Sequence, residues 1–144
     1  EMPAILDFPP AIINAYSLES SIAEKVEAMI KLDVLNSRMK DFYDIWLLSR
    51  QFNFSSKDLG KAIDLTLRNR NTELPEELTS FSDNFIMSKT SQWNAFRKRM
   101  KNDAVPEEFS KVVYHIAEFL EPAISGIRSQ SDSGLQWKAP GPWK

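Results

Sequence analysis

The chain has no cysteine, only four glycines and a single histidine among its 144 residues. Without cysteine it can form no disulfide bond, no thiol nucleophile and no thiolate metal site. A single histidine excludes a histidine-rich metal site, and a Ser-His-Asp triad would have to use His115. The glycines form neither a GxGxxG nor a GxxxxGK[ST] phosphate-binding loop. The sequence therefore excludes several common catalytic frameworks.

Long apolar runs and a strong net charge are also missing. No stretch approaches 18 consecutive apolar residues and no basic-then-apolar leader opens the sequence, so we expect neither a membrane span nor a signal peptide. The net charge of −2 argues against a protein that coats nucleic acid by bulk charge. These absences favour a cytoplasmic protein. The length fits one domain with a hydrophobic core.

Apolar residues at helical spacing and N-capping residues predict an all-α bundle of five to six helices. Ser17, Asn36 or Ser37, and Ser55 can cap the first three helices. The expected helices cover residues 18–31, 38–51, 56–70, 90–101 and 107–128, with a shorter one opened by Pro75. We predict an extended entry segment at 1–16, a helical domain at 17–128 and a mobile tail at 129–144.

Two helices of this bundle carry charged residues within their apolar faces. At about 100° per residue, Lys25 falls among the apolar residues of the first helix and Asp41 between those of the second. The short connection predicts an antiparallel hairpin. Lys25 and Asp44 then lie at the same height, roughly 10 Å from the turn. We therefore expect Lys25, Asp41 and Asp44 to converge.

This cluster has two interpretations. The first is a structural ion pair that ties the two helices together, with Arg38 adding an i,i+3 contact to Asp41. The second is a functional site, since a buried ion pair is often no more stabilising than an apolar replacement. Perturbed buried charge is also a marker of functional sites. The residues alone leave both interpretations open.

The stretch "ESSIAEKVEAMIKL", followed closely by "NSRMKDFYDIWLLS", resembles two motifs of the AbiEii-type nucleotidyltransferases. These proteins are toxins of abortive-infection toxin–antitoxin systems. The segment "AIDLTLRNRNTELP" resembles the next part of the family. The resemblance covers roughly residues 10–100. Its most specific part is a Glu-Lys pair followed by Arg-x-Lys-Asp-x-Tyr-Asp.

The resemblance implies roles for individual residues. Lys25 is expected to contact nucleotide phosphates, and Asp41 is expected to be the active-site aspartate. Glu24, Arg38 and Asp44 match neighbouring motif positions and are expected to support the nucleotide site. The implied reaction transfers a nucleotide from a nucleoside triphosphate, with Mg²⁺, to an acceptor such as tRNA. A lysine would offset phosphate charge, and a carboxylate would accept or orient the proton of the attacking hydroxyl.

Two elements of the family pattern are missing from this sequence. The family has a Gly-Ser motif and an Asp-x-Asp pair that bind the triphosphate and the magnesium ion, and neither is found here. Carboxylates that hold the ions are indispensable in two-metal chemistry. We therefore expect the chain to be the C-terminal helical part of such an enzyme, to hold no metal itself and to be inactive alone.

Other features have their own alternatives. Arg97, Lys98 and Arg99 form a basic helix end that either contacts a tRNA backbone or is a solvated end favoured by the helix dipole. As a whole, the chain could instead be a non-catalytic helical module that binds a protein partner such as an antitoxin. The acidic balance disfavours a DNA-binding domain.

Overall fold

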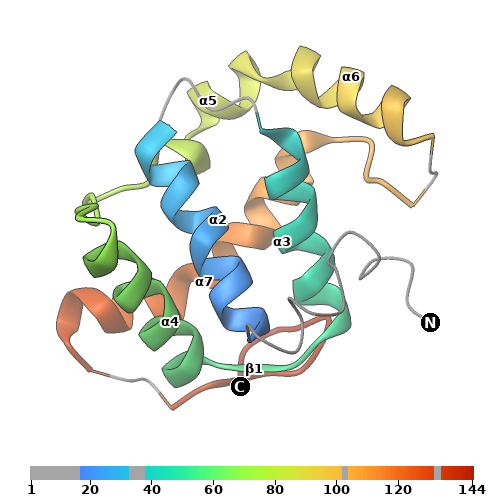
Figure 1. The fold of residues 1–144 in the computed structure, drawn as a ribbon. Helices are drawn as coiled ribbons and strands as arrows, with labels where there is room; N and C mark the ends of the chain where they lie inside the picture. Colours follow the sequence, from blue (N-terminus) through green and yellow to red (C-terminus); the bar gives the residue numbers. More distant parts are fainter. Residues whose placement is uncertain (1–16, 33–37, 102–103, 132–133) are drawn as a thin grey trace.

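The computed structural model describes residues 17–32, 38–101, 104–131 and 134–144. These residues form six α-helices, one 3-10 turn and a two-stranded sheet (Figure 1). In chain order they are α2 (Leu18–Leu32), α3 (Met39–Gln51), β1 (Phe54–Ser55), α4 (Ser56–Asn69), η3 (Thr79–Phe81), α5 (Asp83–Ser88), α6 (Thr90–Met100), α7 (Phe109–Ser129) and β2 (Gln136–Trp137). The predicted all-α bundle is confirmed, because each strand has only two residues.

Serine caps start two of the helices as predicted. The Ser17 hydroxyl accepts a hydrogen bond from the Ser20 backbone N–H at 3.0 Å, and Ser55 accepts one from Asp58 at 3.0 Å. The caps proposed at positions 36 and 37 lie outside the described residues. Arg38 occupies the N-cap position of α3 without a side-chain capping bond.

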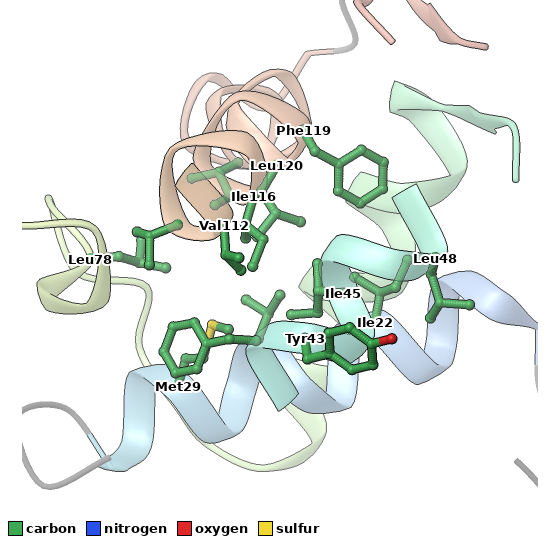
Figure 2. Close-up of a cluster of buried hydrophobic side chains, with 14 of the residues drawn as sticks. Ile22, Met29, Tyr43, Ile45, Leu48, Leu78, Val112, Ile116, Phe119 and Leu120 are labelled. Carbon is green, nitrogen blue, oxygen red and sulfur yellow. The ribbon is translucent and has the colours of Figure 1, made fainter. Parts of the chain in front are cut away.

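Helix α7 lies at the centre of the bundle, where α3 and α4 pack against it, while α2 packs chiefly on α4 (Figure 1). Helices α2 and α3 run in opposite directions, as the predicted hairpin requires. Figure 2 shows side chains from α2, α3 and α7 meeting in the core. The fully buried members include Ile22, Ile45, Val112, Ile116 and Leu120. None of the described helices combines the length and apolar character needed to cross a membrane.

The prediction of a helix opened by Pro75 is wrong. The chain instead forms η3 and the short helix α5, whose first turn is capped by the Ser82 hydroxyl accepting from the Phe85 N–H at 3.1 Å. The Pro75 carbonyl accepts a hydrogen bond from Arg128 of α7 at 2.6 Å. That contact fixes the segment against α7, and the better N-cap lies seven residues further on.

The prediction of a mobile tail is wrong for residues 134–144. Strand β2 pairs antiparallel with β1, with Phe54 opposite Trp137. Trp137 is 1% exposed, and its indole N–H donates to the Ser49 carbonyl at 2.6 Å. Trp143 stacks on Phe119, with ring centroids 6.0 Å apart. The two tryptophans supply apolar area that outweighs the polar composition around them.

Candidate functional site

Lys25 of α2 lies between two carboxylates of α3. Its ammonium nitrogen is 3.4 Å from Asp41 Oδ1 and 3.2 Å from Asp44 Oδ2. The Lys25 side chain is 17% exposed, those of Asp41 and Asp44 only 7% and 2%. The predicted convergence of these three residues is confirmed. It follows from the antiparallel helices and from the one-turn spacing that places both aspartates on one face of α3.

Two further cations contact the same carboxylates. Arg38 Nε is 2.9 Å from Asp41 Oδ2, and Lys40 Nζ is 2.9 Å from Asp44 Oδ2. Three cations thus surround two carboxylates, which gives the cluster a net charge of +1. Asp44 Oδ1 is buried and has no hydrogen-bond partner among the described residues. A buried oxygen of this kind is costly, so stability alone explains the cluster poorly.

Beside this cluster lies an open hollow of about 530 Å³, here called the Lys25 hollow. Lys25 and Arg38 form part of its wall, whereas Asp41 and Asp44 are not among its lining residues. The carboxylates therefore hold the cations in place from behind. The lining residues are Ser20, Ser21, Glu24, Lys25, Glu27, Ala28, Lys31, Leu32, Arg38 and Arg70. Four of these ten are cations and two are carboxylates, so the lining has a net charge of +2 and the hollow is suited to an anion.

Glu24, predicted to support the site, contacts a residue that the sequence analysis did not assign to it. Arg70, at the end of α4, places its guanidinium 2.5 Å from Glu24 Oε1 and 4.0 Å from Glu27 Oε1. Glu27 is buried and accepts a hydrogen bond from the Thr72 hydroxyl at 2.7 Å. Only the helical spacing of Glu24 and Glu27 was visible in the sequence, because the contact with Arg70 joins residues 46 positions apart.

The basic end of α6 is separate from this hollow. Arg97, Lys98 and Arg99 occupy the last turn of α6, and none of them lines the Lys25 hollow. Lys98 and Arg99 are exposed, whereas Arg97 is partly buried and its Nε has no hydrogen-bond partner among the described residues. A contact of this helix end with nucleic acid would therefore lie outside the Lys25 hollow.

A second polar group lies where α3, α7 and the tail meet. His115 Nε2 is 2.8 Å from Ser49 Oγ, and that hydroxyl donates to the Trp46 carbonyl at 2.6 Å. The Ser49 oxygen must then accept a hydrogen bond from His115, so the neutral imidazole carries its proton on Nε2. Burial lowers the pKa of His115, and the nearby positive charge of Arg50 lowers it further. Because Ser49 is fully buried, this Ser-His pair has no access to a substrate.

The described residues do not by themselves make a magnesium site. They bring together no group of three or more His, Asp or Glu side chains arranged to hold a metal ion. Asp41 and Asp44 contact cationic side chains instead, and the remaining oxygen of Asp44 is buried. A Mg²⁺ ion requires several accessible oxygen ligands, which these two carboxylates do not offer.

The fold and the hollow define a helical protein with a cationic site. Comparison with known families shows which family this protein belongs to. The family model described as "Nucleotidyl transferase AbiEii toxin, Type IV TA system" matches residues 1–115 of the 144-residue chain. The chain belongs to this family, which confirms the resemblance found in the sequence. No curated protein matches the chain. No solved structure matches it either.

Proposed function

We propose that this chain supplies the phosphate-binding helical part of a nucleotidyltransferase that transfers a nucleotide from a nucleoside triphosphate to an acceptor. The observation that carries the proposal is Lys25, held between two carboxylates at the wall of a cationic hollow. A cation fixed in advance stabilises phosphate charge without reorganising during the reaction. Membership of the AbiEii family supports the same reaction class.

The proposed role of each charged side chain depends on whether it lines the hollow. Lys25 and Arg38 line the hollow and contact the phosphates. Asp41 and Asp44 lie behind them and hold their charged groups in place. Asp41 is the candidate for orienting the attacking hydroxyl, a step that requires it to turn from Arg38 towards the hollow. Lys25 keeps its contact with Asp44 when Asp41 turns, and this fixed position contributes to catalysis through orientation.

The chain by itself is only part of the proposed enzyme. It lacks a Gly-Ser motif and an Asp-x-Asp pair, so we propose that it is the C-terminal part of the enzyme and is inactive alone. The part of the enzyme that carries those motifs would supply the ligands of Mg²⁺ and complete the triphosphate site. The acceptor is proposed to be tRNA, with the exposed Lys98 and Arg99 of α6 contacting its backbone.

The biological setting follows the family. A toxin of a toxin–antitoxin system acts in the cytoplasm and is paired with an antitoxin, and we extend both features to this chain. Abortive infection as a defence against phage is part of the same proposal. A non-catalytic module that binds an antitoxin remains the alternative, and in that case the charged cluster would serve stability only.

A transfer assay tests the proposal. The chain alone, incubated with labelled nucleoside triphosphates, Mg²⁺ and tRNA, is expected to give no labelled product. The complete polypeptide that includes the Gly-Ser and Asp-x-Asp elements is expected to label the acceptor. In that polypeptide, Lys25→Met and Asp41→Asn are each expected to abolish labelling while leaving the helical circular dichroism signal unchanged.

Two results would contradict this assignment. Transfer by the chain alone would show that the missing motifs are not required. Full activity of the Lys25→Met polypeptide would remove the role of the cluster and favour the non-catalytic alternative. Asp64→Asn serves as the matched control, because Asp64 is a carboxylate paired with a cation outside the hollow.

A further inference from the structure

Arg70 is a cation that lines the Lys25 hollow without belonging to the Lys25 cluster. It reaches the hollow from the end of α4, whereas Lys25 and Arg38 reach it from α2 and the start of α3. Its guanidinium contacts Glu24, which lines the same hollow. Both side chains are open to solvent, with Arg70 50% and Glu24 43% exposed. Arg70 therefore contacts a carboxylate that faces the same space as the proposed phosphate site.

The backbone that carries Arg70 is fixed by contacts that do not involve its side chain. Asn71 adopts a left-handed conformation with φ of 54°, and the Thr72 N–H donates to the Leu67 carbonyl at 2.9 Å, which closes the end of α4. The Thr72 hydroxyl then anchors the turn to the buried Glu27. The turn is thus held on α2 independently of the contact between Arg70 and Glu24.

We propose that Arg70 is a further phosphate-binding residue of the hollow, and that Glu24 competes with the phosphate for it. The inference rests on the proposed function, since it assigns a residue to the same anion site. An exposed ion pair contributes little stability, so the guanidinium can leave Glu24 at small cost. Arginine matches phosphate oxygens in a bidentate manner and keeps its charge throughout.

Competition between Glu24 and phosphate for Arg70 predicts a different effect on anion affinity from an ion pair that only stabilises the fold. If Glu24 holds Arg70 away from the anion, removing its charge strengthens anion binding. If the pair only ties α2 to α4, removing either partner changes stability and leaves anion affinity unchanged. The chain offers a matched control pair in Arg68 and Asp64, which are 3.1 Å apart on α4 and do not line the hollow.

Isothermal titration of the whole chain with inorganic tripolyphosphate, at an ionic strength of about 0.15 M and without Mg²⁺, distinguishes these cases. Arg70→Ala is expected to weaken binding on the order of tenfold, the scale of a charged hydrogen bond. Glu24→Gln is expected to tighten binding about two- to fivefold, the scale of an exposed ion pair. Arg68→Ala and Asp64→Asn carry the same charge changes and are expected to alter the affinity less than about twofold, as separated surface charges do.

The outcomes separate this inference from the proposed function. If Lys25→Met weakens binding but Arg70→Ala behaves like Arg68→Ala, the inference is overturned and the phosphate site stands. If Glu24→Gln weakens binding, Glu24 is a support rather than a competitor, and the competition is overturned. If the unaltered chain does not bind tripolyphosphate, both the inference and the proposed site are contradicted. Thermal melting of each variant verifies that the titrated protein is folded.

Discussion

Two of the buried polar groups among the described residues differ in how completely their hydrogen bonds are satisfied. At the junction of α3, α7 and the tail, Ser49 contacts His115 through its hydroxyl and Trp137 through its carbonyl. Beside the Lys25 hollow, cations outnumber carboxylates, and Asp44 Oδ1 has no partner among the described residues. The first group is closed by protein contacts, whereas the second opens onto a hollow.

This difference distinguishes a structural polar group from a candidate site. A closed network stabilises one arrangement of the chain and needs nothing from solvent. A cluster with excess charge at a hollow can still gain from a ligand of the opposite charge. The Ser-His pair, which by residue type looks more catalytic, is therefore the structural group, and the lysine–aspartate cluster is the candidate site.

The largest expected effect on stability comes from the closed group. Replacing Trp137 by alanine removes a buried ring and its hydrogen bond to Ser49, so we expect a loss of about 3–5 kcal/mol in the free energy of unfolding. Urea denaturation measures it, with the exposed Met87→Ala as a control. A loss below about 1 kcal/mol, the size of a surface change, would mean that the tail is not part of the fold.

A smaller loss is expected from Asp44. Asp44→Ala removes the buried carboxylate that contacts both Lys25 and Lys40, so we expect a destabilisation of about 2 kcal/mol. Asp64→Ala removes an exposed partner and is expected to cost less than about 0.5 kcal/mol. Equal losses in the two variants, measured by urea denaturation, would remove the distinction between the buried cluster and an ordinary surface pair.

The smallest effect is a pH dependence in the closed group. The pKa of His115 is lowered below 6.5 in the folded protein by burial and by Arg50, against an opposing effect of Glu118. Below pH 6.5 the unfolded chain therefore binds the proton more readily, and stability falls as the pH decreases towards the folded pKa. His115→Gln keeps a donor for Ser49 and is expected to reduce this fall. Melting temperatures between pH 7 and 5 measure it, and identical slopes would contradict it.

The sequence predicted most of the helices and the contact between α2 and α3, but not the structure that follows Pro75. Helical periodicity and serine caps are short-range signals, and a short connection between two helices fixes which faces meet. Lys25, Asp41 and Asp44 could therefore be placed together before the structure was known.

Contacts between distant segments were not predictable in the same way. The tail is rich in Ser, Gly and Pro, and nothing local to it indicates that Trp137 packs beside Ser49, 88 residues away. Likewise the contacts of Arg70 with Glu24 and of Thr72 with Glu27 depend on how α4 crosses α2. Such contacts are set by tertiary packing, for which neither periodicity nor capping gives a signal.

The most direct test of the account compares the unaltered chain with its Lys25→Met variant. Asp41 keeps Arg38 and Asp44 keeps Lys40 in this variant, so the loss in the free energy of unfolding should stay below the about 3–5 kcal/mol of a buried carboxylate left without any cation. Calorimetric titration with inorganic tripolyphosphate should nevertheless show affinity at least about tenfold weaker. Unchanged affinity together with a large loss of stability would contradict the account, because Lys25 would then be a structural residue.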